Sequence, residues 1–289
     1  QGMMSHTAST TISRYFTNTR GKALSTGWFG LSTAEFLMPV TIIYALTIMD
    51  WRNIWIIISV AIILFLPLVS YFLVKEVKLS SREDDNEVIK ENIKQWKRSE
   101  VIKDYRFIII ALNMLAMPWI ATGIFVYQSF ILSAKNWGEY TIAQSFMVYS
   151  IASVLTLFVA GYLIDKFTSR KLLIYMNIPF LISLLILIYF QSPVSSFFFL
   201  GLIGVSNGFA NVLGSSTWAE LYGVKFIGSI KALTTALMVF STAFGTALFG
   251  LMIDFDFSIE QISMISGGYI LISLILLFLI KNKLNPTIL

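Results

Sequence analysis

One carboxylate lies deep inside a long apolar run of this sequence. Glu35 sits near the middle of the run 23–49 and is the only acid well inside any such run. A carboxylate costs roughly 2–3 kcal/mol to place in lipid, so it normally faces a cavity or a partner. Loss of water favours the neutral form of a carboxyl group, which makes Glu35 a candidate proton carrier. The alternative is a protonated Glu35 that is hydrogen-bonded to Ser and Thr of neighbouring helices.

A second group of ionisable residues lies in the turn between two apolar runs. The segment 161–171 reads Gly161-Tyr-Leu-Ile-Asp165-Lys166-Phe-Thr-Ser-Arg170-Lys171, and Glu220 lies near the end of another run. We expect Asp165, Arg170 and Glu220 to lie together on one face of the membrane. The simplest interpretation is that these charges anchor helix ends at the interface.

Amide and phenol side chains within the apolar runs are candidates for lining a central cavity. Such groups can orient a small polar or anionic solute, although they also form hydrogen bonds between membrane helices. The candidates are Asn113, Tyr127, Gln128, Gln144, Asn207 and Asn211.

Enzymatic, metal and nucleic-acid functions fit the sequence poorly. There is no cysteine and the single histidine is His6, so neither a Cys/His pair nor a metal-binding cluster can be assembled. Nucleophile-elbow and phosphate-loop patterns are absent from the sequence. The basic residues lie between apolar runs and form no arm for nucleic acid. We therefore expect no catalytic residues, no cofactor, no metal and no nucleic-acid partner.

These residues must be positioned by helices in a lipid bilayer. Only 13% of the residues are charged, against roughly a quarter in soluble domains, so the chain has too little polar surface for a water-soluble globule. A helical span takes about 20 apolar residues, and continuous runs exclude the alternation of a membrane barrel. The sequence predicts an all-α polytopic bundle with a partial helix at Gln1–Phe16. The eight predicted spans are 23–49, 53–74, 107–133, 140–164, 172–190, 194–219, 227–253 and 259–280.

The distribution of basic residues predicts the topology. Nineteen of the 21 Lys and Arg residues lie on alternate connections, and only Arg52 and Lys135 lie on the others. Connections rich in Lys and Arg stay in the cytoplasm. We expect a multi-pass protein of the plasma, or bacterial inner, membrane, with segment 75–106 and the C-terminus cytoplasmic. We expect the protein to be a monomer.

Residues 75–106 predict a division of the chain. This segment is dense in charges of both signs and contains amphipathic spacing, as expected for a solvated linker with a short surface helix or for a hinge on the membrane face. The predicted domains are 1–74, the end of a first bundle; 75–106, a linker; and 107–289, a complete six-helix bundle. Within the predicted domain 107–289, Gly201, Gly204 and Gly208 predict close helix packing.

Two bundles joined by a charged linker resemble the plan of the major facilitator superfamily. Segment 161–171 resembles the Gly-x-Leu-x-Asp-[Arg/Lys]-x-x-x-[Arg/Lys] loop between the second and third helices of a bundle in that family. Segment 14–23 is similar to its basic Arg-Gly-x-Ala turn between the fourth and fifth helices. Segment 218–232, with Trp218-Ala-Glu220-Leu-Tyr222-Gly223 and Gly228-Ser-Ile-Lys231-Ala, is similar to the tenth-to-eleventh helix junction of members that carry carboxylates.

The resemblance implies several expectations about the mechanism. The family's first three helices would be missing from this chain. By the family's pseudo-symmetry, Asp165 would lie at the amino end of the helix that starts at Lys22 or Ala23, where free N–H groups favour an anion. Such a contact would join the two bundles in one state only and would act as a gate lock. Lys231 lies within about one turn of the end of its span, so we do not expect it to bind substrate.

The function implied is secondary active transport by alternating access. The favoured substrate is a small organic anion such as a monocarboxylate, moved together with a proton. Transport of a sugar, nucleoside or drug is the alternative within the class. A membrane enzyme or a non-transporting scaffold is the alternative outside it.

Overall fold

The computed structural model describes residues 3–16, 19–74 and 93–287. Its regular elements are helices, as expected for continuous apolar runs whose backbone groups must be satisfied within each segment. In chain order they are α1 (Met3–Tyr15), α2 (Arg20–Leu46), α3 (Trp51–Val74), α5 (Arg98–Val101), α6 (Tyr105–Ala116), η1 (Met117–Ala121), α7 (Thr122–Val126), α8 (Gln128–Lys135), α9 (Glu139–Phe167), α10 (Ser169–Met176), α11 (Ile178–Tyr189), α12 (Ser195–Tyr222), α13 (Ile227–Asp254), α14 (Ile259–Ile280) and η2 (Lys281–Lys283).

The helix boundaries follow local capping chemistry. The Asp104 side chain accepts from the backbone N–H of Arg106 at the start of α6. Ser258 and Gln261 form a reciprocal capping box at the start of α14. At the end of α12, Gly223 takes a positive φ of 80°, which a glycine adopts at little cost.

Seven of the eight predicted spans are confirmed as helical segments long and apolar enough to cross a membrane. The first predicted span, 23–49, falls on α2. The seven are Trp51–Val69, Tyr105–Val126, Gln144–Phe167, Ser169–Tyr189, Ser195–Tyr222, Ile227–Asp254 and Ile259–Lys283. The predicted all-α, polytopic fold is therefore confirmed.

The chain forms two compact units. One contains residues 1–32 and 91–289, and the other contains residues 33–90. The second unit holds the remainder of α2 and all of α3, whose span is only 6% buried. The predicted domain limits of 1–74, 75–106 and 107–289 differ from this grouping and stay a prediction. Most of the predicted linker, residues 75–92, lies outside the described residues.

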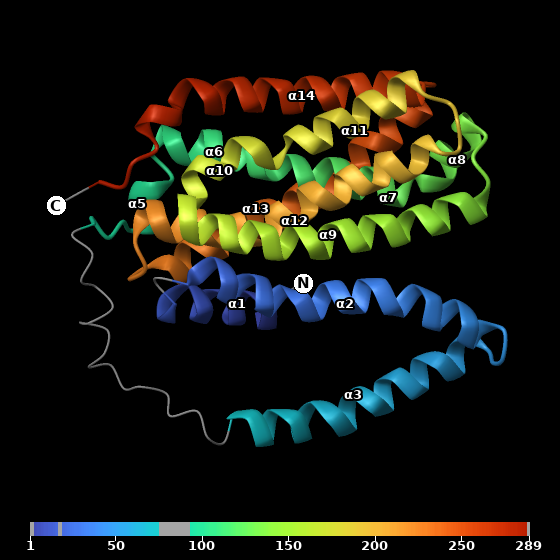
Figure 1. Cartoon of the computed structure of the whole chain (residues 1–289), viewed down its shortest axis with the longest axis horizontal. Coiled ribbons are helices and arrows are strands. Elements are labelled where there is room, and N and C mark those ends of the chain that lie inside the picture. The colour runs from blue at the N-terminus through green and yellow to red at the C-terminus, as the bar shows by residue number, and fades with distance from the viewer. Residues whose placement is uncertain (1–2, 17–18, 75–92, 288–289) are drawn as a thin grey trace. The chain divides into compact units, whose positions relative to one another are not determined.

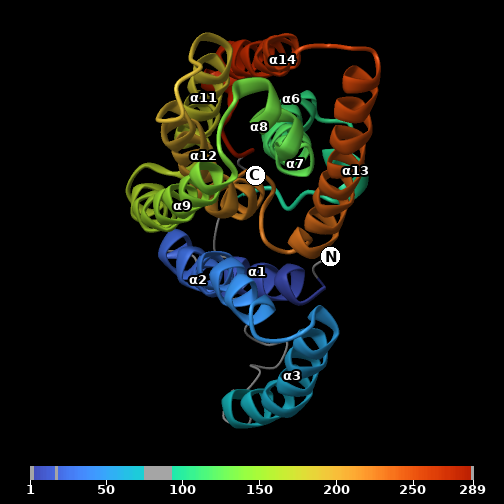
Figure 2. The ribbon, with the colours of Figure 1, turned by 90° about the vertical axis from the view of Figure 1, so that its right-hand side faces the viewer.

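Within the first unit, α9 and α12 form the most extensive helix pair, and α12 also packs on α11 (Figure 1). In the view turned by 90° from Figure 1, α6 and α7 lie between α13 on one side and α11 and α12 on the other (Figure 2). Helix α14 lies beyond α6 in Figure 2, next to α11. The fully buried side chains of this unit form a core of large apolar residues. Many apolar side chains on its outer surface are exposed, as expected where the solvent is lipid.

The predicted span 107–133 is not one regular helix. Pro118 has no N–H to donate, so the helix cannot keep its regular bonding there, and residues Met117–Ala121 form a π-helical turn. A second interruption follows at Tyr127, between α7 and α8.

Side chains from other helices capture three backbone carbonyls of α6 just before the π-helical turn. Each donor comes from a different part of the bundle, so this stretch connects α6 to α13, α14 and the α10–α11 junction. The pairs are Tyr269 Oη to Leu112 O (2.7 Å), Asn177 Nδ2 to Asn113 O (2.6 Å) and Ser241 Oγ to Leu115 O (3.3 Å).

We call the end of this unit that carries Asp165, Glu220 and Lys281 the Asp165 end. At the same end, the short helix α5 begins after Lys97, and the side chain of Glu100 in its first turn reaches back to the Lys97 backbone. The Glu100 carboxylate accepts from the Lys97 backbone N–H (2.7 Å) and pairs with the Lys94 ammonium (2.9 Å). These two interactions, the backbone bond foremost, lower the pKa of Glu100 below its ordinary value.

Candidate functional site

Helices α2 and α9 approach each other most closely at two glycines. A Cβ at Gly21 would overlap the Gly161 carbonyl oxygen, and a Cβ at Gly161 would lie 2.8 Å from the Gly21 oxygen and 2.7 Å from Ser25 Oγ. Only glycine therefore fits at either position without a shift of backbone. We call the contact made by Gly21, Ser25, Gly161 and Asp165 the α2–α9 seam.

Asp165 completes the seam by capping the start of α2. The backbone N–H of Gly21 donates to Oδ1 of Asp165 (2.7 Å), and the N–H of Lys22 donates to Oδ2 (3.1 Å). These N–H groups belong to the first turn of α2, where no intrahelical acceptor exists. A carboxylate there gains two charge-assisted hydrogen bonds and the favourable end of the helix dipole. Asp165 lies where the sequence analysis places it.

Glu220, the other acid of the predicted group, caps a different helix. The backbone N–H of Ser169, the first residue of α10, donates to both carboxylate oxygens of Glu220 (2.9 and 3.1 Å). Arg170 Nε lies 3.8 Å from Glu220 Oε2. Glu220 therefore holds the turn between α9 and α10 to α12, while Asp165, at the end of α9, binds the start of α2. In that turn Thr168 has a φ of 74°, which is strained for a β-branched residue.

The two lysines of the same segment do not join the site. Lys166 and Lys171 are exposed, and Lys166 lies 5.3 Å from the centroid of the neighbouring Phe167 ring. Sequence spacing alone groups these lysines with Asp165 and Arg170. In the structure, Asp165 and Arg170 form hydrogen bonds to other parts of the bundle.

The sequence analysis missed Lys231. It is only 5% exposed, and its Nζ donates to Ser9 Oγ (2.7 Å), which joins α13 to α1. From its position about one turn from the end of the helix, Lys231 was not expected to bind substrate, and its burial was not considered. The many hydroxyl residues in the sequence of α1, such as Thr7, Ser9 and Thr10, were the available signal, because a polar helix in lipid needs polar partners.

The predicted cavity residues occupy different environments. Asn113 is fully buried and donates to Ser273 Oγ (3.2 Å), while Asn207 donates to Ser153 Oγ (3.0 Å). Gln144 is exposed and Asn211 is half-buried, one turn from Asn207. The structure does not gather these amides at one point.

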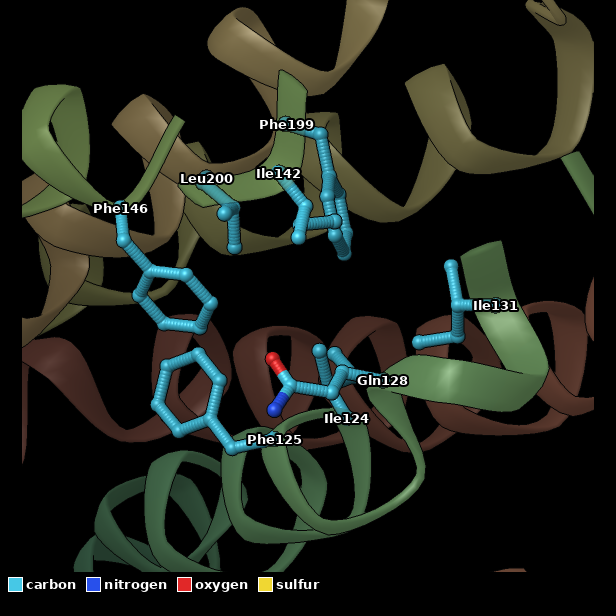
Figure 3. Close-up of a pocket in the computed structure, with 8 residues that line it drawn as sticks. All are labelled: Ile124, Phe125, Gln128, Ile131, Ile142, Phe146, Phe199 and Leu200. Atoms are coloured by element: carbon cyan, nitrogen blue, oxygen red, sulfur yellow. The ribbon is translucent and has the colours of Figure 1, made fainter. Parts of the chain in front are cut away.

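Tyr127 and Gln128 lie beside the interruption between α7 and α8. The amide of Gln128 extends into a small pocket with otherwise apolar walls, between Phe125 and Phe146 on one side and Phe199 and Ile142 on the other (Figure 3). The Tyr127 hydroxyl lies against Gly250 of α13, 2.5 Å from where a Cβ would be placed.

Glu35 lies in α2, but its side chain is outside what the structure describes. Its candidate role in proton transfer therefore stays a prediction.

Comparison with known protein families links the chain to one of them. The family model described as Major Facilitator Superfamily matches residues 1–246 and, in a second match, residues 108–288. No curated protein matches the chain. With the seven membrane-length helices, the family match identifies an integral, multi-pass membrane protein.

Proposed function

Since this chain belongs to the major facilitator superfamily, a family of secondary transporters, we propose that it moves a small organic anion together with a proton by alternating access. In this proposal the Asp165 end is cytoplasmic, the protein works as a monomer and the membrane is the plasma membrane. The α2–α9 seam is the gate on the cytoplasmic side.

The cap that Asp165 places on α2 carries the proposal. It joins a helix that precedes the charged linker to one that follows it, through two hydrogen bonds to backbone N–H groups. A carboxylate on a helix start can release its N–H groups to water at a moderate net cost, since hydrogen bonds to charged groups contribute about 1.5–3 kcal/mol each when exchange with water is counted. A gate contact needs this property, because it forms in one state and breaks in the other.

Lys231 supports an anionic substrate. It is a buried cation in a membrane helix, and such residues mark solute or ion pathways by default. Its hydrogen bond to Ser9 crosses from α13 to α1, so opening of the Asp165 end would expose it to water and to an anion.

Glu35 is the proposed proton carrier. It is the only acid well inside an apolar run, and its removal from water favours a neutral carboxyl group that can carry a proton across. An anion that enters with one proton moves without net charge, which avoids work against the membrane potential.

Uptake by proteoliposomes that contain the full-length protein tests the proposal. We expect accumulation of lactate or acetate driven by an inward pH gradient, and at least a tenfold loss of pH-driven uptake in Glu35→Gln, with exchange of one anion for another retained. A matched control is Asp254→Asn, which removes an exposed acid at the opposite end of the bundle, the end of α13. Uptake of a sugar, a nucleoside or a lipophilic drug in place of the acids would overturn the substrate class, and full pH-driven uptake by Glu35→Gln would overturn the role of Glu35.

A further inference from the structure

The segment Leu284–Thr287, here called the tail, is fixed against the Asp165 end by hydrogen bonds to its backbone. Leu284 is only 4% exposed. Arg170 Nη1 donates to Leu284 O (3.0 Å) and to Asn285 Oδ1 (3.0 Å), and Arg106 Nη1 donates to Asn285 O (2.8 Å). Two guanidinium groups from different helices therefore bind two consecutive residues of the tail.

The residues that end the charged linker bind the same structure. The backbone N–H of Lys94 donates to Thr287 O (2.8 Å), and the N–H of Trp96 donates to Tyr222 O (3.0 Å). The side chain of Gln95 accepts from the N–H of Lys225 (3.0 Å). The tail thus lies between the linker and the two arginines, with hydrogen bonds to both.

Both arginines are held by buried or half-buried acids. Arg106 forms an ion pair with Asp104 (2.8 Å), which also accepts from the Tyr222 hydroxyl (3.2 Å). Arg170 lies beside Glu220, the cap of α10. Each arginine therefore links the tail to an acid that caps the start of a helix.

The position of Arg170 matters for the proposed gate. It lies five residues after Asp165 across the strained turn at Thr168, and Glu220 holds that turn by the N–H of Ser169. Without its hold on the tail, Arg170 would keep only the long contact of 3.8 Å to Glu220. The turn would then keep the bond from the Ser169 N–H to Glu220 but lose its connection to the tail, so Thr168 would relax more readily from its positive φ and Asp165 would move with it.

We propose that the tail is a clasp that positions the α9–α10 turn, so that Asp165 meets the start of α2, and that it couples the linker to this gate. This inference rests on the proposed function, because it concerns the gate of a transporter. Arg170 acts in it as a positioning residue: it contacts neither the substrate nor the start of α2. The tail acts through the same turn and would be displaced whenever the linker is pulled away from Thr287.

The absence of cysteine from the sequence allows a direct test with single reporters. Leu24 of α2 is fully buried beside the seam, and Leu187 of α11 is fully buried elsewhere in the bundle. The rate at which N-ethylmaleimide modifies Leu24→Cys, here called the seam rate, reports opening of the seam. The rate for Leu187→Cys, here called the bundle rate, reports general loosening. Both are measured in the full-length protein in detergent.

We expect truncation after Lys283, and separately Arg170→Ala, to raise the seam rate about tenfold, as the loss of charge-assisted hydrogen bonds predicts. The bundle rate should stay unchanged. Asn285→Ala, which removes one acceptor and leaves the fold intact, should raise the seam rate about threefold. The exposed, basic control Lys103→Ala should leave both rates unchanged.

Asp165→Asn, measured in the same background, separates the two proposals. If it raises the seam rate while the tail variants do not, the gate stands and the clasp is wrong. If Asp165→Asn has no effect, the gate itself is wrong and the clasp falls with it. An equal rise of the seam rate and the bundle rate in the tail variants would make the tail a general brace and would also overturn the clasp.

Discussion

Helix α9 makes two close contacts through glycine, and they differ in chemistry. Toward α12 it meets Gly204 and Gly208: a Cβ at Gly204 would overlap Tyr149 O, and one at Gly208 would lie 2.6 Å from Ser153 O. Toward α2 it meets Gly21, and there Asp165 adds two hydrogen bonds to backbone N–H groups.

This difference separates a permanent contact from one that can open. The α9–α12 contact has hydrogen bonds between side chains at two places, Asn207 to Ser153 (3.0 Å) and between the hydroxyls of Ser145 and Ser196 (2.7 Å), and is otherwise close packing, which lipid cannot replace at equal density. The α2–α9 seam is smaller and ends in a charged group whose hydrogen bonds water can replace. Close packing between α9 and α12 holds the bundle together. The start of α2 can separate from α9 because water can take over the hydrogen bonds of Asp165.

The largest expected effect is on the permanent contact. Gly204→Ala forces a methyl group onto a backbone oxygen, so one helix must shift. We expect a loss of roughly 3 kcal/mol in the free energy of unfolding, measured by reversible denaturation in mixed micelles. The matched control is Gly214→Ala in the same helix, whose Cβ would meet nothing within 4 Å. A Gly204→Ala protein as stable as the control would refute the packing argument.

Gly21→Ala should open the seam and spare the bundle. The new methyl group would clash with Gly161 O, while α2 adds Leu24 and the partly buried Trp28 to one of the two core clusters that contain α9 and α12 residues, and the other cluster has no α2 residue among those that the structure describes. We expect the seam rate to rise at least tenfold, with a fall of less than about 1 kcal/mol in stability. Gly30→Ala, with nothing near its Cβ, is the control. An equal loss of stability in Gly21→Ala and Gly204→Ala would erase the distinction between the two contacts.

Asp165→Asn should weaken the seam without a steric clash. The amide keeps the shape of the side chain but loses the negative charge that favours the start of α2, a difference of about 1 kcal/mol. We expect a roughly fivefold shift toward the open seam, measured by the seam rate or by spin-label distances between α2 and α9. An unchanged distribution together with normal transport would show that Asp165 only anchors its helix end.

Much of the fold was predictable from sequence, because continuous apolar runs in lipid leave the backbone few alternatives to a helix. The place of Asp165 at the start of α2 was also predictable, from the repeat of the family plan in both bundles. The close approach of Gly21 to Gly161 was not, because small residues are common in membrane helices and their partners depend on three-dimensional packing. The burial of Lys231 was not predictable for a related reason: depth along a helix does not reveal which neighbour covers a side chain.

The smallest expected effect concerns the hydrogen bond between Asn207 and Ser153 in the permanent contact. Asn207→Ala should cost about 0.6 kcal/mol, the average for hydrogen bonds between membrane helices. Ser153→Ala should cost a similar amount, and the double variant should cost no more than either single one. Additive losses of stability would show that the two side chains act independently. Loss of transport in Asn207→Ala with unchanged stability would support the predicted role of Asn207 in lining the substrate cavity.

The π-helical turn at Met117–Ala121 accommodates one extra residue per turn, and each residue of an α-helix rotates the next by about 100°. The side on which Tyr127 and Gln128 emerge is therefore determined by the presence of this turn as much as by their identity. A lineage that lost one residue here would keep its sequence downstream and yet present a different face of α7 and α8. Alignments of related chains across Pro118 should accordingly allow for single-residue gaps when they compare which side chains look inward.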